Sequence, residues 1–259
     1  MFDFHLHSLV SFDGHDTSVA MARAAKEKGL REICFTDHID YIPKMWYMAF
    51  DTAVYSASYD DLEVPGVTIR RGMEFGLTPD NREQFLKDLK RRPFDFVIGS
   101  VHIVDGLDVY YPEFWQGKTA EQAVERYLRE TLACVKAHEG FDVLGHLTYI
   151  SKARANPAWA PVRCEEYREL ADEILKTLVD KGIGLELNTS GLARSGDFLP
   201  PRAFLERYRE LGGQIVTIGS DAHTAGRVGD HVEQGLEILK GVFGHVCTFA
   251  GRKPVFHKL

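Results

Sequence analysis

Nine side chains of the kinds that bind divalent metal ions follow directly after short apolar segments of this 259-residue chain. Six are histidines and three are carboxylates: His5, His7, Asp13, His38, Glu74, His102, His146, Asp221 and His223. Imidazole and carboxylate groups are common protein ligands of zinc, manganese and iron. When such groups leave several parallel strands at the same end, a barrel can build one site from distant parts of its sequence. The pattern favours a metal-dependent hydrolase.

Two pairs in this set have the spacing of neighbours on one face of a strand. His5 and His7 are two residues apart, and Asp221 and His223 repeat that spacing near the end of the chain. Because side chains alternate across a strand, each pair can reach one ion. An isolated pair of this kind occurs often by chance. The specific observation is the combination of both pairs with further ligand candidates after other strands.

For a single member of the set, roles other than metal binding are also possible. Glu74 alone could be a solvated carboxylate. Together with the other ligand candidates, its two oxygens suit a bridge between neighbouring cations. His102 and His146 follow strongly apolar segments, and the alternative for each is a buried histidine bonded to the backbone. Asp13 and His15 compete for one ligand position after the first strand. The prediction of a metal site therefore depends on the set as a whole.

Other candidate groups have predicted supporting roles or none. Asp37 is predicted to accept a hydrogen bond from a metal-binding imidazole, or to be a weaker ligand, since such imidazoles usually donate their second N–H to a carboxylate. The remaining histidines lie on predicted helices or near the C-terminus and are expected to be unrelated to the site: His138, His231, His245 and His257. The sequence contains no Gly-x-Ser-x-Gly motif and no P-loop, so the chemistry is assigned to the ions.

The composition is that of a globular chain with an acidic balance. With 44% apolar residues, the chain can bury a large core and fits a single domain over residues 1–259. A formal net charge of −7 argues against nucleic-acid or anionic-membrane partners, because both need a basic surface. A small phosphorylated substrate remains compatible, since a metal pocket can be locally positive. No apolar segment approaches the roughly 20 residues that span a bilayer.

Cysteine usage and the N-terminal sequence point to one compartment. The four cysteines form no Cys-x-x-Cys pair, and Cys34 and Cys134 lie inside apolar segments, which predicts small buried side chains. Free thiols of this kind suit a reducing cytoplasm. The chain opens directly into a strand pattern, without the regions of a secretory signal. We therefore expect a cytoplasmic protein, whose state as monomer or homo-oligomer the sequence leaves open.

Strand-like and helix-like segments alternate along the chain. Predicted strands lie at the start of the chain and at 31–36, 67–73, 94–101, 141–145, 183–188 and 214–219, and predicted helices lie at 17–29, 80–91, 119–138, 163–181, 201–211 and 229–241. Residues 39–59 are predicted to be a loop rich in aromatic side chains, namely Tyr41, Trp46, Tyr47, Phe50 and Tyr55. This loop either covers the active site or packs on the core. Seven strands in alternation with helices favour a closed parallel barrel over an open sheet.

Six short motifs, taken in order, resemble those of the PHP (polymerase and histidinol phosphatase) superfamily. They are His5-Leu6-His7-Ser8, Thr36-Asp37-His38, Gly72-Met73-Glu74, Ser100-Val101-His102, Gly145-His146 and Ser220-Asp221-Ala222-His223. The resemblance runs from His5 to about Gly251. Four further segments resemble more narrowly the histidinol-phosphatase branch of that superfamily: 94–102, 145–149, 185–191 and 226–229.

The resemblance implies a fold and a set of ligands. The fold is an α/β, distorted (β/α)7 TIM-like barrel of the PHP type, with three divalent metal ions at its carboxyl-end mouth. The implied ligands are His5, His7, Glu74 and Asp221 for one ion, Glu74, His102 and His146 for a second, and Asp13, His38 and His223 for a third. It favours Asp13 over His15, which is kept in reserve. Zinc, manganese and iron all suit such a site.

The resemblance also implies an activity. It is the hydrolysis of L-histidinol phosphate to L-histidinol and phosphate in histidine biosynthesis, with water activated by the metal ions. Catalytic roles fall on Asp13 and on two loop arginines, Arg154 and Arg194, which would clamp the substrate phosphate. Glu113 and Asp197 are candidate partners for the substrate amine or imidazole. The group that protonates the leaving alkoxide is left open.

Two other functions are less favoured by the sequence. The first is a phosphoesterase of the same superfamily that acts on a nucleotide or on phosphotyrosine, and it is less favoured because the sequence has no inserted domain or basic segment. The second is a metal-storing or regulatory barrel without activity. It is less favoured because all nine ligand positions are filled, although a fold alone does not establish a function.

Overall fold

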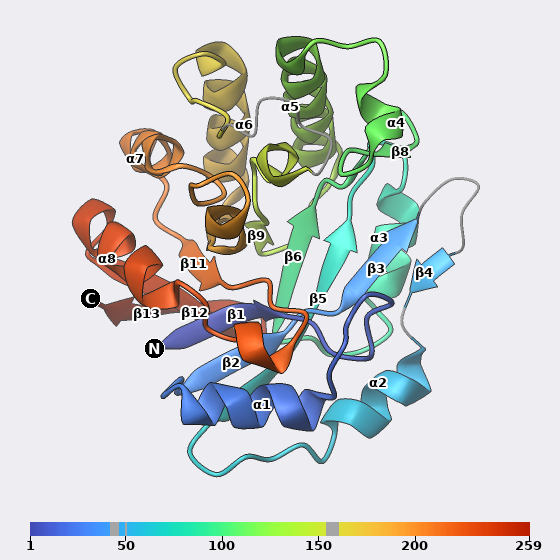
Figure 1. The fold of residues 1–259 in the computed structure, drawn as a ribbon, viewed down its shortest axis with the longest axis vertical. Helices are drawn as coiled ribbons and strands as arrows, with labels where there is room; N and C mark the ends of the chain where they lie inside the picture. Colours follow the sequence, from blue (N-terminus) through green and yellow to red (C-terminus); the bar gives the residue numbers. More distant parts are fainter. Residues whose placement is uncertain (42–46, 50, 154–160) are drawn as a thin grey trace.

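Seven parallel strands form a nearly closed barrel in the computed structural model, which describes residues 1–41, 47–49, 51–153 and 161–259 (Figure 1). Their order is β1 (Phe2–Leu6), β2 (Glu32–Phe35), β5 (Thr68–Gly76), β6 (Phe96–Ser100), β9 (Val143–Leu144), β10 (Gly184–Asn188) and β11 (Val216–Gly219). Next to β11 and β1, Asp221 N donates to His5 O at 2.8 Å, and His7 N donates to Ala222 O at 3.0 Å. The predicted distorted seven-stranded barrel is confirmed.

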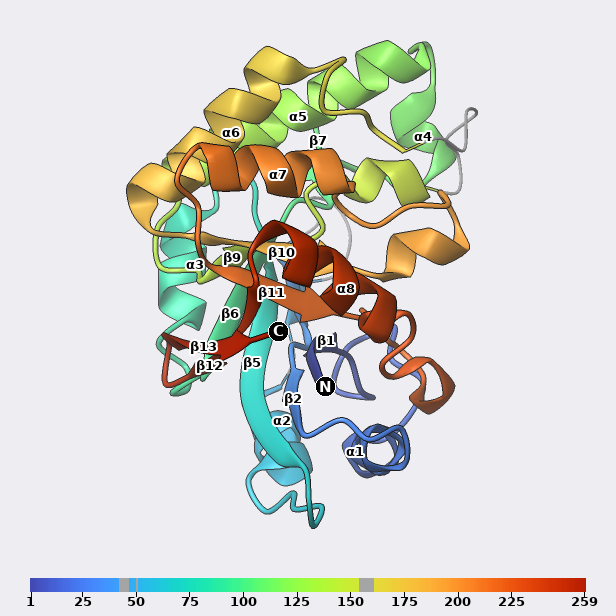
Figure 2. The ribbon, with the colours of Figure 1, turned by 90° about the vertical axis from the view of Figure 1, so that its left-hand side faces the viewer.

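Helices cover the outside of the barrel, with α5, α6 and α7 on one side and α1 and α2 on the other (Figure 2). Their bounds are α1 (Ser18–Glu27), α2 (Thr52–Tyr59), α3 (Arg82–Asp88), α4 (Pro112–Trp115), α5 (Ala120–Ala137), α6 (Arg168–Lys181), α7 (Arg202–Glu210) and α8 (Val232–Val242). Short 3-10 helices are η1 (Tyr149–Lys152), η2 (Ser190–Ala193) and η3 (Ala225–Arg227). Thr119 and Gln122 begin α5 with a reciprocal capping box, which fixes its first turn. The helix predicted from residue 163 begins only at Arg168.

The segment 39–59 contains regular structure, so the prediction of a loop was wrong there. β3 (His38–Tyr41) pairs in parallel with the second half of β5, and it pairs antiparallel with β4 (Tyr47–Ala49). The first half of β5 pairs with β2 instead. β2 and β3 therefore pair with successive halves of the same strand, β5. This pairing places His38 opposite Glu74.

The same segment also forms helix α2, which carries aromatic side chains into the core. The Asp51 carboxylate caps this helix by accepting from Ala53 N at 2.6 Å. Tyr55 and Tyr59 are four residues apart, so they share one helical face, and both are buried. These two tyrosines pack on the core and do not cover the site. The other predicted loop aromatics Trp46 and Phe50, with the side chain of Tyr47, lie outside the described residues.

The barrel interior has an apolar layer below the polar ends of the strands. A hairpin that the sequence pattern did not predict, β12 (His245–Ala250) and β13 (Lys253–Lys258), contributes to this layer. The layer consists of Phe4, Cys34, Phe96, Ile98, Val143, Cys247 and Phe249. Glu74 and Ser100 follow further along β5 and β6, toward the carboxyl ends. The hairpin thus helps to fill the end of the barrel opposite the predicted ligands.

A β-bulge in β1 serves both layers. The register of β1 against β2 shifts between Asp3 and Leu6. An extra residue of this kind changes the direction of the side chains beside it. As a result Phe4 packs against Phe96 in the apolar layer, while the adjacent His5 reaches Glu74 in the polar layer.

Two expectations from composition can be compared with the structure. All four cysteines are buried and free, which confirms the prediction for Cys34 and Cys134. Over the described ranges, no helix has both the length and the apolar character that a membrane crossing requires.

Candidate metal centre

The structure brings all nine predicted ligands together at the carboxyl ends of the strands, at a cavity of about 420 Å³. Those that line the cavity are Asp13, His38, Glu74, His102, His146, Asp221 and His223. His5 and His7 are fully buried beside them. Side chains from both ends of the chain therefore meet in one cluster.

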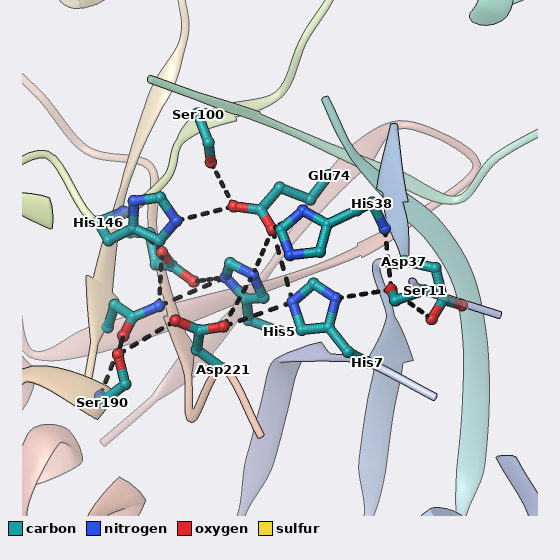
Figure 3. A network of polar contacts seen from close by, with 12 residues as sticks. His5, His7, Ser11, Asp37, His38, Glu74, Ser100, His146, Ser190 and Asp221 are labelled. Carbon is teal, nitrogen blue, oxygen red and sulfur yellow. Dashed lines mark hydrogen bonds and ion pairs between the residues drawn. The ribbon is translucent and has the colours of Figure 1, made fainter. Parts of the chain in front are cut away.

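Glu74 lies at the centre of the cluster (Figure 3). Its Oε1 is 2.7 Å from Nε2 of His146 and accepts a hydrogen bond from Ser100 Oγ at 2.6 Å. Its Oε2 lies 3.2 Å from Nε2 of His5 and 3.1 Å from Nδ1 of His38. The two oxygens face different histidines, which is the arrangement expected of a bridging carboxylate.

Asp221 lies on one flank of the cluster and also contacts a cation. Its Oδ1 is 3.4 Å from Nε2 of His7 and 3.8 Å from Nε2 of His5. Its Oδ2 is 2.5 Å from the Lys152 ammonium, which also donates to Ser190 Oγ at 3.0 Å. Asp221 has a left-handed backbone, with φ of 55°, a conformation that Asp tolerates better than most residues. The turn after β11 thereby aims its carboxylate at the two histidines of β1.

Asp13 lies on the other flank, and the structure separates it from its competitor His15. Oδ2 of Asp13 is 3.2 Å from Nε2 of His223 and 3.8 Å from Nε2 of His38. His15 is exposed where it lines the same cavity. This placement favours Asp13 as the group that would share an ion with the two histidines.

Four of the six histidines of the cluster are held through their outer nitrogens. A metal-binding imidazole uses one nitrogen for the ion, and the other usually has a fixed hydrogen-bond partner. Here the partners of Nδ1 are Glu186 for His5 at 2.6 Å, Ser11 for His7 at 3.1 Å, Asp40 for His102 at 3.1 Å and the Asp221 carbonyl for His223 at 3.0 Å. Nε2 of each of these rings is thus left for an ion.

Sequence reasoning missed Asp40 and Glu186 and assigned Asp37 incorrectly. Among the described residues, the Asp37 carboxylate accepts hydrogen bonds from Ser8 N and Ser11 Oγ, both at 2.9 Å, and from the Tyr59 hydroxyl. Adjacent side chains of an extended segment point to opposite sides, which turns Asp37 away from the face of His38. A carboxylate inside the buried strand β10 was the feature that could have revealed Glu186.

The donor set fits divalent cations. Several buried atoms of the cluster have no hydrogen-bond partner among the described residues: Nε2 of His5, Nε2 of His7, Nδ1 of His38, Nδ1 of His146, Oε2 of Glu74 and Oδ1 of Asp13. Leaving one such group unsatisfied costs about 1–3 kcal/mol. Four groups of three residues have ligand atoms within 4.8 Å of one another: His7, His38 and His223; His5, His7 and Glu74; His38, Asp40 and His102; Glu74, His102 and His146. Cations bound within these groups would satisfy the Nε2 atoms of His5 and His7 and the carboxylate oxygens of Glu74 and Asp13.

The electrostatics of the cluster favour an ionised Glu74 and a neutral His7. Burial acts to lower the pKa of His5, His38 and His102, but the neighbouring carboxylates outweigh it and raise the pKa of each. Burial acts to raise the pKa of the Glu74 carboxyl, but the imidazoles of His5, His38 and His102 outweigh it and hold that pKa well below its ordinary value. Burial, with neighbouring histidines, holds the pKa of His7 well below its ordinary value. At neutral pH, Glu74 is therefore an anion and His7 is neutral, as coordination requires.

Cations and tyrosines line the rest of the cavity. Lys152, Arg194 and Arg227 contribute positive charge, and the Arg194 guanidinium lies 5.3 Å from the centre of the Tyr110 ring. The predicted phosphate ligand Arg154 lies outside the described residues. Of the predicted acidic partners, Glu113 is exposed on α4, and Asp197 accepts from Phe198 N at 2.7 Å. Neither lines the cavity, whereas Asp108 does.

Known proteins resemble this chain over nearly its full length. The chain is 33% identical to a probable histidinol-phosphatase of Clostridium acetobutylicum, over 99% of this chain and 96% of the relative. It is 32% identical to the histidinol-phosphatase of Lactococcus lactis, over 97% and 95%. The crystal structure of histidinol phosphate phosphatase from Lactococcus lactis, complexed with zinc, L-histidinol and phosphate, superposes with a TM-score of 0.86 at 30% identity and covers 98% of each chain.

Fold and site together define a class of α/β barrel with a cluster of metal-binding side chains at the carboxyl ends of its strands. Residues 3–190 match the PHP domain. The chain belongs to the PHP domain family, as its sequence motifs predicted.

Proposed function

We propose that this chain is a metal-dependent phosphomonoesterase that hydrolyses L-histidinol phosphate to L-histidinol and phosphate. The observation that carries the proposal is the cavity itself, in which the cluster of metal-binding side chains lies beside the cationic side chains of Lys152, Arg194 and Arg227. The full-length similarity to histidinol-phosphatases supports this choice of substrate. The relative solved with zinc, L-histidinol and phosphate supports it further.

The proposed centre holds three divalent ions, of zinc, manganese or iron. The proposed ligands are His5, His7, Glu74 and Asp221 for the first ion, Glu74, His102 and His146 for the second, and Asp13, His38 and His223 for the third. When bound, such ions supply a water of lowered pKa and positive charge for the phosphoryl oxygens. Two observations support the assignment. The side chains of each group lie close to one another, and several of their buried polar atoms have no hydrogen-bond partner among the described residues.

The residues around the ions have proposed roles in binding. Arg194 and Lys152 would hold phosphoryl oxygens, since cationic donors bind phosphate through charge-assisted hydrogen bonds. Arg154 is proposed to act with them on the strength of its position in the sequence alone. Asp108 and Tyr110 also line the cavity and would contact the organic part of the substrate.

We also propose that residues 1–259 form one domain, because strands and helices from the whole chain pack on a single barrel. The cytoplasm remains the predicted compartment.

A phosphate-release assay tests the function. The chain reconstituted with zinc or manganese should release phosphate from L-histidinol phosphate faster than from a nucleoside monophosphate or phosphotyrosine. His7→Ala should lose bound metal and activity together, because its Nε2 lies at the first proposed ion. Faster release from the nucleoside monophosphate or from phosphotyrosine would contradict the proposed substrate and favour that compound instead. Full turnover by the variant would contradict the site.

A further inference from the structure

One carboxylate lies between two of the proposed ion sites. Asp40, in β3, is only 3% exposed, and its two oxygens face two different imidazoles. Oδ1 lies 3.1 Å from Nδ1 of His102, and Oδ2 lies 3.1 Å from Nδ1 of His38. We propose that Asp40 is a positioning residue shared by the second and third ions, so that a change at this residue weakens the binding of both.

The contact with His102 sets the role of that ring. A carboxylate can only accept, so Nδ1 of His102 must carry the proton that it shares with Asp40. The opposite nitrogen, Nε2, then keeps its lone pair. It lies 3.4 Å from Oε1 of Glu74 and 3.4 Å from Nε2 of His146, the other two ligands proposed for the second ion.

The contact with His38 is at ion-pair distance without a hydrogen bond, because Nδ1 of His38 has no hydrogen-bond partner among the described residues. With Nδ1 beside Oδ2 of Asp40, Nε2 of this ring faces Asp13 at 3.8 Å. Nδ1 also lies 3.1 Å from Oε2 of Glu74, so two carboxylates hold the ring from one side. Asp40 therefore offers one oxygen to a histidine of each ion, and its charge makes both imidazoles better ligands.

The neighbouring strand leaves space for this carboxylate. A Cβ added to Gly76, at the end of β5, would overlap Oδ1 of Asp40. The backbone of Gly76 is not among the left-handed glycines, so the conformation does not require a glycine there. The position instead requires a residue without a side chain, because Asp40 fills the space.

Zinc binding by the whole chain tests the inference without recourse to activity, although the inference rests on the three-ion site of the proposed function. The protein is stripped with a chelator and titrated with Zn²⁺ in competition with a chromophoric chelator. Native mass spectrometry counts the ions on each chain. The wild type should bind three.

Asp40→Asn keeps the size of the side chain but offers one oxygen and one N–H₂ group. One ring then faces a donor in place of an acceptor, and both rings lose the negative charge. At a zinc concentration that fills the wild type, this variant should hold one ion, with about 10- to 100-fold weaker affinity for the other two. Gly76→Ala should give the same pattern, because its new Cβ displaces the Asp40 carboxylate while leaving its charge.

Asp37→Asn is the matched control. Asp37 is as deeply buried as Asp40 and three residues away, but its carboxylate contacts hydroxyl and amide groups. This variant should keep the second and third ions. The inference is overturned if Asp40→Asn binds three ions with wild-type affinity, if it loses only one, or if Asp37→Asn loses the same two. A wild type that binds fewer than three ions also overturns it, whereas three ions without phosphatase activity would contradict only the proposed function.

Discussion

Glu74 joins the two halves of the metal centre through its two oxygens. Oε1 meets His146 and Ser100, whereas Oε2 meets His5 and His38. Because these partners lie on opposite sides of one carboxylate, the loss of either oxygen affects a different part of the cluster. The proposed centre is therefore more sensitive at this residue than at a ligand on its flanks.

Glu74→Gln tests this sensitivity. Glutamine keeps the shape of the side chain but places an N–H₂ group where one oxygen faced an imidazole. We expect fewer ions per chain and a loss of phosphate release of at least about 100-fold, beyond the effect of residues that only orient ligands. Elemental analysis and the phosphate-release assay measure the two effects. Glu125→Gln, at an exposed pair with Arg129, should change neither, and normal metal content in Glu74→Gln would disprove the bridging role.

At the scale of elements, close approach between strands brings the ligands together. Gly219 ends β11 next to β1, and a Cβ there would overlap the Cβ of His5 and lie 2.7 Å from Oε1 of Glu186. His5 is the ring that Glu186 orients toward Glu74. The absence of a side chain at Gly219 thus determines where a ligand on the neighbouring strand can lie.

Gly219→Ala should consequently disturb both the fold and the site. Overpacking of this kind costs about 1–3 kcal/mol in the free energy of unfolding, and we expect that loss together with reduced metal content. Denaturant unfolding and elemental analysis provide the measurements. Gly226→Ala is the control, because a Cβ at Gly226 meets no atom within 4 Å and its φ lies outside the left-handed region. Equal behaviour of the two variants would contradict the argument.

At the scale of the whole molecule, the residues that stabilise the barrel and the candidate metal ligands occupy different levels along the barrel axis. Phe249, on the C-terminal hairpin, packs against Phe96 with ring centroids 4.9 Å apart. The metal-binding side chains lie further along the strands, beyond this apolar layer. A change in the layer should therefore lower stability without changing the ligands.

Phe249→Ala tests the separation. Removal of a buried phenylalanine side chain costs about 3–5 kcal/mol, which should appear as a lower free energy of unfolding. Metal bound per folded chain should stay at the wild-type value. Phe256→Ala, on the same hairpin but 53% exposed, should leave stability nearly unchanged. A loss of metal from folded Phe249→Ala protein would show that the two layers are coupled.

The sequence predicted features with local patterns and missed those that depend on distant contacts. The ligands were found because each follows an apolar strand segment, as His102 follows β6. Asp40 and Glu186 were missed because the histidines to which they are hydrogen-bonded, His102 and His5, lie 62 and 181 residues away in the chain. The hairpin β12–β13 was missed for a similar reason, since its apolar side chains pack only against residues of distant barrel strands.

The apolar layer at one end of the barrel has a consequence for how substrate enters and products leave. With that end filled, substrate and both products must use the same opening, and the proposed function places the phosphoryl group deepest, at the ions. The alcohol must then depart first, and phosphate is the last occupant. Inorganic phosphate should accordingly compete with substrate for the free protein, and product-inhibition kinetics would reveal a different order if the alcohol were the competitive product.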